Sequence, residues 1–202
     1  LFMRCAEKLS KMLIVHEEVL KRRLTTEYGI RPSKITVIPH GVGSIRMRVR
    51  EKRVEARGKL GFPPDSFVLL WFGRVTLYKS PTILLAAFKK LATLREDIYL
   101  VMCGTSHRNL TLKEWFTSHV PEKDTVMKQR VKVTGHVTDD DLDNVFLASD
   151  LIVFPYTALV SSPGPLHIAA AYELPFLVSD SLRCYSSSDE GIFHLCIDDL
   201  CS

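Results

Sequence analysis

Two cations and three glycines follow apolar stretches of the chain, and their chemistry suits a phosphate ligand. Arg74 comes directly after a buried apolar run and Gly73, and Lys79 follows in the same loop. Arg binds a diphosphate through paired hydrogen bonds, and Lys acts as a mobile point charge. Gly104 and Gly135 end two later apolar runs, where the missing side chain lets backbone approach a ligand closely. The alternative is that Arg74 and Lys79 are solvated surface cations.

A second phosphate-binding element is predicted between residues 150 and 180, which have the pattern strand, polar connector, helix, strand. The connector, residues 157–165, contains two serines, two prolines and a glycine, and residues 166–172 are apolar enough for a packed helix. Ser161 or Ser162 can cap that helix and leave free N–H groups at its mouth. In a parallel sheet this mouth lies beyond the carboxyl ends of the strands, where it favours phosphate. The alternative is an ordinary βαβ crossover with nothing bound.

Several other kinds of site are not indicated by the sequence. No GxGxxG follows a strand, and the chain has no GxxxxGK[ST], HExxH or GxSxG motif. The five cysteines form no CxxC pair, so neither a disulfide framework nor a zinc site is expected, and a reducing compartment is favoured. Three histidines, at loop or helix-start positions, are expected to face the cleft at the strand ends: His40, His136 and His167.

The overall composition is that of an ordinary globular protein, with 46% hydrophobic and 25% charged residues among 202. A formal charge of +4 fits anionic ligands without requiring nucleic acid. No apolar run is long enough for a membrane span, and no signal peptide is visible. We therefore expect a cytoplasmic location, at most peripheral at the inner membrane face. Because the chain opens on Leu1 rather than Met, it is interpreted as a fragment of a longer protein.

Strands and helices are expected to alternate along the chain. This order predicts a doubly wound α/β fold with a parallel sheet. Ser80 and Thr138 are the expected N-caps of two helices, and residues 121–128 are expected to be a loop. The expected strands are residues 12–16, 34–39, 67–72, 98–103, 131–134, 151–155, 175–178 and 192–197, and the expected helices are 1–11, 17–28, 82–94, 110–119, 141–148 and 166–172.

The composition changes abruptly at residues 44–59, which contain five Arg, two Lys and two Glu. Such a run marks a linker or a solvated helix between two units. A nucleic-acid-binding arm is the alternative, but no aromatic residues interleave the charges to stack on bases. No nucleic-acid partner is therefore expected.

Four segments, in this order and spacing, resemble the donor-binding half of "group 1" glycosyltransferases, which have the GT-B architecture and are close to sequence-based family 4. They are VIPHGV (37–42), WFGRVTLYKSPTILLAAFKKL (71–91), VTGHVTDDDLDNVFLASDLIVFPY (133–156) and SSPGPLHIAAAYELPFLVSD (161–180). The resemblance covers residues 12–180.

The resemblance implies two Rossmann-like domains that face each other across a cleft. Residues 1–43 then correspond to the end of the N-terminal, acceptor-side domain and residues 44–60 to a basic linker. Residues 61–202 correspond to the nucleotide-sugar donor-binding domain, truncated at its C-terminus.

The resemblance also implies roles for individual residues. Arg74 and Lys79 would bind the diphosphate and act in catalysis, and no metal or other cofactor would be required. The loop Gly135, His136 and Val137 would hold the base. The helix mouth would contact the distal phosphate or the sugar, through Ser161, Ser162, Gly164, Pro165, Leu166 and His167.

One departure from the family pattern concerns two glutamates, eight positions apart, that help to hold the donor sugar and the ribose. The first falls on Val160 or Leu159 and the second on Ile168 or His167, none of which is acidic. Glu173 is the nearest carboxylate in this segment. His167 is the expected substitute for the ribose ligand.

The function expected from this resemblance is transfer of a sugar, with retention, from a nucleotide-sugar to an acceptor. The acceptor, a glycan, a lipid or a small molecule, is not identified by the sequence. The enzyme would be of the hexosyltransferase type and metal-independent, and the fragment alone is expected to be inactive. The alternatives are a non-catalytic nucleotide-sugar- or partner-binding relative, which the missing glutamates favour, and a nucleotide-sugar epimerase.

Overall fold

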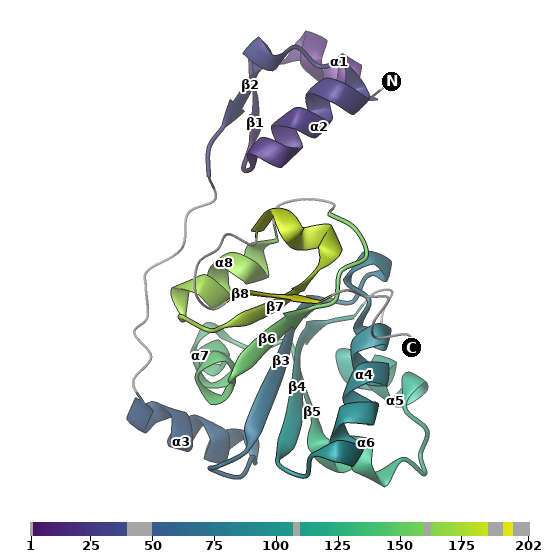
Figure 1. The fold of residues 1–202 in the computed structure, drawn as a ribbon, viewed down its shortest axis with the longest axis vertical. Coiled ribbons are helices and arrows are strands. Elements are labelled where there is room, and N and C mark those ends of the chain that lie inside the picture. The colour runs from purple at the N-terminus through teal and green to yellow at the C-terminus, as the bar shows by residue number, and fades with distance from the viewer. Residues whose placement is uncertain (1, 40–49, 107–109, 160–162, 186–191, 196–202) are drawn as a thin grey trace.

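The computed structural model describes residues 2–39, 50–106, 110–159, 163–185 and 192–195, which form a small N-terminal unit and a larger α/β unit (Figure 1). In the small unit two strands pair in parallel, with Leu13 opposite Ile35, and two helices accompany them. The carboxyl ends of these strands face the larger unit (Figure 1). The elements of the small unit are α1 (Phe2–Leu9), β1 (Leu13–Val15), α2 (Glu18–Tyr28), the 3₁₀ turn η1 (Pro32–Lys34) and β2 (Ile35–Val37).

The larger unit is built on a six-stranded parallel sheet in the order β5-β4-β3-β6-β7-β8. Counted from β3 as the first strand, this is the doubly wound order 3-2-1-4-5-6. The predicted fold class, a Rossmann-like doubly wound parallel sheet, is therefore confirmed. Its strands are β3 (Phe67–Arg74), β4 (Ile98–Thr105), β5 (Val131–Gly135), β6 (Leu151–Phe154), β7 (Phe176–Ser179) and β8 (Ile192–Leu195).

Helices cover both faces of this sheet (Figure 1). On one face lie α4 (Pro81–Leu94), α5 (Leu112–His119) and α6 (Thr125–Arg130), and on the other lie α7 (Asp139–Ala148) and α8 (Gly164–Ala171). Because strand side chains alternate between the two faces, each strand contributes to two hydrophobic clusters. In β3, Val68 and Leu70 join the cluster that contains α7 and α8, while Leu69 and Trp71 join the cluster that contains α4 and α5.

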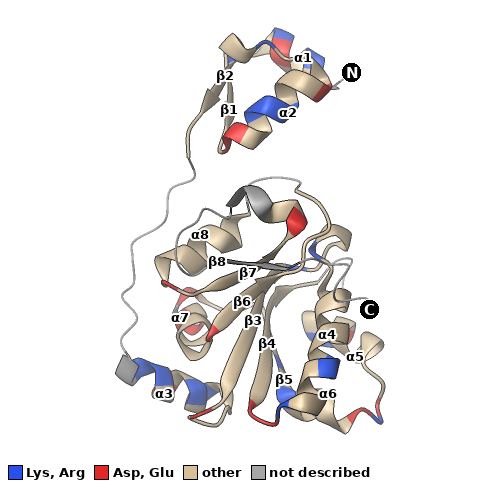
Figure 2. Ribbon diagram, viewed as in Figure 1, with Lys and Arg blue, Asp and Glu red and all other residues tan. Residues whose placement is uncertain are grey.

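Helix α3 (Arg50–Leu60) lies in the basic segment and packs on the larger unit, where Ala56 and Arg57 are buried. The Arg57 guanidinium donates to the Ala148 carbonyl (3.1 Å), to the Pro64 carbonyl and to the Asp150 carboxylate (2.6 Å). Figure 2 shows the basic residues of α3 at the amino ends of the strands, away from their carboxyl ends. The basic helix therefore does not line the presumed ligand site. Residues 44–49 of the predicted linker lie outside the described residues.

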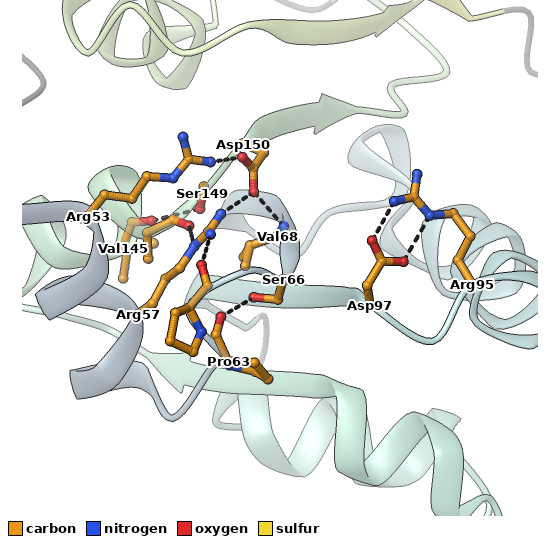
Figure 3. Close-up of polar contacts among 12 residues, drawn as sticks. Arg53, Arg57, Pro63, Ser66, Val68, Arg95, Asp97, Val145, Ser149 and Asp150 are labelled. Atoms are coloured by element: carbon orange, nitrogen blue, oxygen red, sulfur yellow. Dashed lines mark hydrogen bonds and ion pairs between the residues drawn. The ribbon is translucent and has the colours of Figure 1, made fainter. Parts of the chain in front are cut away.

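The Asp150 carboxylate is the centre of this network (Figure 3). It accepts the Val68 N–H at 2.7 Å and pairs with both Arg53 and Arg57. The side chains of Arg57 and Asp150 are 7% and 16% exposed, so the pair is largely shielded from water. Asp150 thus joins the beginning of β3, the beginning of β6 and helix α3.

Two local predictions are wrong, and one is confirmed. Residues predicted as a loop contain α6, because the Asp124 side chain caps that helix by accepting the Met127 N–H and Met127 is buried. Ser80 does not cap α4, because its hydroxyl donates to the Leu77 carbonyl at 2.9 Å instead. Thr138 caps α7 as predicted, since its side chain accepts the Asp141 N–H.

Replacing Asp150 with Ala removes the carboxylate that pairs with the buried Arg57 and accepts the Val68 N–H. We expect the free energy of unfolding to fall by roughly 3–5 kcal/mol, measured by urea denaturation. Asp97→Ala is the matched control, because Asp97 pairs with Arg95 at the surface, where the two side chains are about half exposed (Figure 3). The control should lose much less stability. Equal losses would contradict a special role for Asp150.

Candidate functional site

The switch point of the sheet lies between β3 and β6, which are neighbours. From β3 the chain continues to α4 on one face of the sheet, and from β6 it continues to α8 on the other (Figure 1). Connections that diverge in this way leave a crevice at the carboxyl ends of the two strands, where doubly wound folds bind ligands. The loop with Arg74 and Lys79 and the described part of the connector before α8 therefore lie at the same edge of the sheet.

The glycines at this edge allow a very close approach of β3 and β4. Both strands continue past the predicted ends, so that Gly73 pairs opposite Gly104. Their φ angles are +138° and +135°, which favour glycine. A Cβ on Gly104 would lie 1.9 Å from the Gly73 carbonyl oxygen, and a Cβ on Gly73 would lie 2.6 Å from Lys79 Nζ. Backbone packing thus requires glycine at position 104, and at position 73 the positive φ favours glycine, since the flexible end of Lys79 could move aside.

Lys79 is a buried cation, with 9% of the residue exposed. It ends the 3₁₀ turn η2 (Leu77–Lys79), and its Nζ lies 5.5 Å from the centre of the Tyr156 ring. Burial lowers the pKa of Lys79 below its usual range, and the nearby Arg74 guanidinium lowers it further. Arg74 itself is exposed. The alternative of two solvated cations therefore fails for Lys79.

Within the described residues, no carboxylate balances the positive charge at this point. Neither Arg74 nor Lys79 makes an ion pair with a carboxylate in the part of the chain that the structure describes. The charged form of Lys79, disfavoured by burial and by the neighbouring Arg74 guanidinium, is stabilised by an anionic ligand. The arrangement is suited to a group with more than one negative charge, such as a diphosphate.

Tyr78 and Tyr156 pack against each other beneath the cations, with ring centres 5.5 Å apart and ring planes at 89°. The connector after β6 is attached to this pair, because Thr157 N–H donates to the Tyr78 carbonyl at 2.7 Å. The Tyr156 hydroxyl is buried without a hydrogen-bond partner among the described residues, and burial raises its pKa. The aromatic pair therefore shields the Tyr156 hydroxyl beside Lys79 from water.

Two hydroxyls at the same edge were missed by the sequence analysis. The side-chain oxygens of Thr76 and Ser106 are buried and have no hydrogen-bond partner among the described residues. The two segments are neighbours, because Val75 N–H donates to the Thr105 carbonyl at 2.8 Å. Buried hydroxyls without partners are costly unless a ligand or water satisfies them. Their place just beyond the strand-end glycines was the sequence signal that could have found them.

The residues predicted to hold the base lie at the end of β5, the outer strand on the β4 side of the sheet. Gly135 has a φ of +76°, which favours glycine. His136 is exposed, while Val137 is half-buried and packs against the core. The loop therefore presents backbone and an imidazole to the same carboxyl edge as the cations.

The structure describes the predicted helix mouth from Pro163 onward. Helix α8 begins at Gly164, followed by Pro165, with Pro163 in the N-cap position and no side-chain cap, so the prediction of a serine cap is wrong. Proline suits the first turn of a helix because its ring fixes φ and it lacks the N–H. Leu166 packs in the core and His167 is half-buried. Ser161, Ser162 and His40 lie outside the described residues.

The described residues contain no group of three or more His, Cys, Asp or Glu side chains that is arranged to hold a metal ion. Within the same ranges, each helix is too short or too polar to cross a membrane.

The lowered pKa of Lys79 predicts a pH-dependent cost to the fold. Between that pKa and the ordinary value of 10.5, the unfolded chain holds the proton and the folded chain does not, so stability rises with pH across this window. Below the window both states are charged and the burial cost is complete. Lys79→Met should therefore raise the free energy of unfolding by about 0.5–2 kcal/mol at neutral pH, and this gain should fade toward pH 10.5. Denaturant titrations over pH 6–10 measure it, and a constant gain would contradict the assignment.

Comparison with protein families and with curated proteins identifies glycosyltransferases. The model of the family described as "Glycosyl transferases group 1" matches residues 52–184. D-inositol 3-phosphate glycosyltransferase of Streptomyces bingchenggensis is 30% identical over 153 residues, which are 71% of this chain and 32% of that protein. A second D-inositol 3-phosphate glycosyltransferase, from Kineococcus radiotolerans, is 27% identical over 150 residues, which are 71% of this chain and 34% of that protein. The chain thus spans about a third of the length of the curated relatives it matches.

Solved structures agree on the fold. Anabaena Alr3699/HepE, solved in complex with UDP and glucose, aligns with a TM-score of 0.74 at 18% identity, over 96% of this chain and 51% of that one. WaaG, a glycosyltransferase involved in lipopolysaccharide biosynthesis, has a TM-score of 0.74 at 17% identity, over 93% and 51% of the two chains. The family model matches more than half of the chain. The strand order of the chain is doubly wound, and Arg74 and Lys79 lie at its switch point. The chain belongs to the group 1 glycosyltransferase family.

Proposed function

We propose that this chain is mainly the donor-binding half of a glycosyltransferase that transfers a sugar, with retention, from a nucleotide-sugar to an acceptor. The observation that carries the proposal is the buried Lys79 ammonium beside Arg74 at the switch point, without a carboxylate partner among the described residues. A nucleotide-sugar brings a diphosphate, whose two negative charges match these cations. The UDP and UDP-glucose complexes of Alr3699/HepE support a donor of this class.

The chemistry follows from where charge develops. As the bond between the sugar and the diphosphate breaks, negative charge grows on the leaving phosphate oxygens. Arg74 and Lys79 stabilise that charge, with help from the N-terminus of α8, and we propose that they do so without a metal. Because a preformed dry site needs little reorganisation, the buried position of Lys79 favours this role. Both residues are therefore catalytic as well as binding residues.

The other donor contacts are proposed from the placement of the loops. The base lies against Gly135, His136 and Val137 at the end of β5, and the ribose lies near His167 on α8. The phosphate and sugar lie between the base and the ribose contacts and the cations, where the buried hydroxyls of Thr76 and Ser106 hydrogen-bond phosphate or sugar oxygens.

The acceptor side remains open to experiment. We propose that the small unit is the end of an acceptor-side domain and that the 202-residue chain binds donor but transfers sugar slowly or not at all. The curated relatives are named for D-inositol 3-phosphate, which makes it a first acceptor to assay. A cytoplasmic location, at most peripheral to a membrane, fits the irregular cysteine spacing.

A non-catalytic, donor-binding relative is the second candidate function. It is favoured by the positions where the family carries glutamates, since Leu159 and His167 or their neighbours occupy them. The two functions differ in whether the protein transfers or hydrolyses a sugar donor. Conversion of free donor without any acceptor would instead indicate an epimerase.

Arg74→Ala and Lys79→Ala test the diphosphate clamp by isothermal titration with UDP and with uridine. Each substitution should weaken UDP binding by roughly 1.5–3 kcal/mol, the value of a charge-assisted hydrogen bond, and leave uridine binding unchanged. Lys90→Ala is the control, because Lys90 is an exposed lysine on α4. Equal losses for UDP and uridine would show that folding rather than the clamp was affected. Failure of the parent to bind any nucleoside diphosphate would refute the proposed function.

His167→Ala tests the ribose contact. A neutral imidazole has one donor and one acceptor nitrogen, so it can hydrogen-bond a ribose hydroxyl as a carboxylate would. The substitution should cost about 1–2 kcal/mol of UDP affinity with the fold intact. The decisive comparison is UDP against its 2′,3′-dideoxy analogue. If the parent and the variant lose the same affinity when the hydroxyls are removed, His167 does not touch the ribose.

A further inference from the structure

Arg23 of α2 reaches from the small unit to the connector that follows β6. Its Nη1 donates to the Leu159 carbonyl at 2.9 Å, and its Nε donates to Glu27 Oε2 at 2.9 Å. Glu27 lies one turn further along α2, so it orients the guanidinium toward the connector. The Glu27 hydrogen bond and charge also raise the pKa of Arg23, which keeps the side chain cationic. One side chain thus joins the two units of the chain.

Two residues before Leu159, at Thr157, the connector is hydrogen-bonded to the loop that carries Lys79. Thr157 N–H donates to the Tyr78 carbonyl at 2.7 Å, and its hydroxyl donates to the same carbonyl at 3.3 Å. Tyr78 directly precedes Lys79, and Tyr156, just before Thr157, lies beneath the Lys79 ammonium. Hydrogen bonds and backbone therefore run without a break from Arg23 to the cation of the donor site.

A cavity of about 740 Å³ lies where the two units meet at this connector. Arg23, Glu27 and Tyr28 line it from α2, and Ala158, Leu159 and Ser181 line it from the larger unit. Arg23 and Leu159 both line this cavity and are joined by the hydrogen bond across it. A change in how the small unit lies against the connector must therefore alter the Arg23–Leu159 bond.

We propose that Arg23 is a positioning residue for the donor site: it holds the connector at Leu159, and the connector in turn holds the Tyr78–Lys79 loop in place for the diphosphate. This inference rests on the proposed function. Arg23 does not touch the donor, so it acts through Thr157 and Tyr78. The role gives the small unit an influence on donor affinity in addition to its part in acceptor binding.

The size of the effect is limited by the exposure of the contact. The Arg23 side chain is 42% exposed, so water competes for its hydrogen bonds. One such bond, acting through a connector that keeps its other contacts, should change UDP affinity by about two- to tenfold. Direct loss of Lys79 should weaken binding more than loss of Arg23.

The experiment compares Arg23→Ala, Arg23→Lys and Arg22→Ala in the 202-residue chain. Arg22 is the matched control, because it is the preceding arginine of α2 and its side chain is exposed. The first measurement, made without ligand, is hydrogen exchange at the Thr157 amide. Arg23→Ala should speed this exchange, Arg23→Lys should restore part of the protection, and Arg22→Ala should leave it unchanged.

The second measurement is a double-mutant cycle for UDP binding between Arg23→Ala and Lys79→Ala. If Arg23 acts through the Lys79 loop, the two losses are not additive, whereas independent sites give additive losses. Unchanged exchange at Thr157, or additive losses, would overturn the inference while leaving the proposed function intact. If the parent does not bind UDP, the donor role fails, and the exchange data alone decide whether Arg23 holds the connector.

Discussion

The ion pair between Asp150 and Arg57 fixes the two strands on which the site depends. Asp150 begins β6, accepts the Val68 N–H of β3 and pairs with the buried Arg57 of α3. It therefore sets the relative position of β3 and β6 at their amino ends. From this contact β3 and β6 run side by side, pairing Leu69 with Leu151 and Leu70 with Ile152, toward the carboxyl ends where Arg74 and the β6 connector lie. The network at the amino ends thus supports the two strands that carry the candidate site.

Buried positive charges have opposite surroundings at the two ends of these strands. At the amino ends, the Arg57 guanidinium is paired with a carboxylate and with backbone carbonyls. At the carboxyl ends, Lys79 is buried over an aromatic ring and beside another cation, which destabilises its charged form. The first arrangement stabilises the fold, whereas the second lowers the stability of the fold and would be relieved by a bound anion. This contrast separates a structural cluster of arginines from a candidate binding site more clearly than residue type does.

The sequence predicted the strands of the sheet and placed the candidate site residues at its carboxyl edge, where the structure has Arg74, Lys79 and Gly135. Strand and helix alternation sufficed for the fold class, because apolar runs with strand-end glycines have few other solutions. The sequence did not predict that Lys79 is buried, because the Lys79 ammonium packs over Tyr156, which lies far along the chain. The orphan hydroxyls of Thr76 and Ser106 were missed for the same reason. Contacts between distant segments carry no local pattern, so these features required the three-dimensional structure.

Strand order also bears on how the larger unit folds. Neighbours β3, β4 and β5 are consecutive in the chain, as are β6, β7 and β8, while the β3–β6 pairing joins the two sets. That pairing brings together residues as far apart as Val68 and Asp150, which are 82 positions from each other. Closing so long a loop has a high entropic cost, which slows folding. By this reasoning the β3–β6 pairing, and with it the edge that carries Arg74 and Lys79, is the part of the sheet whose formation costs most.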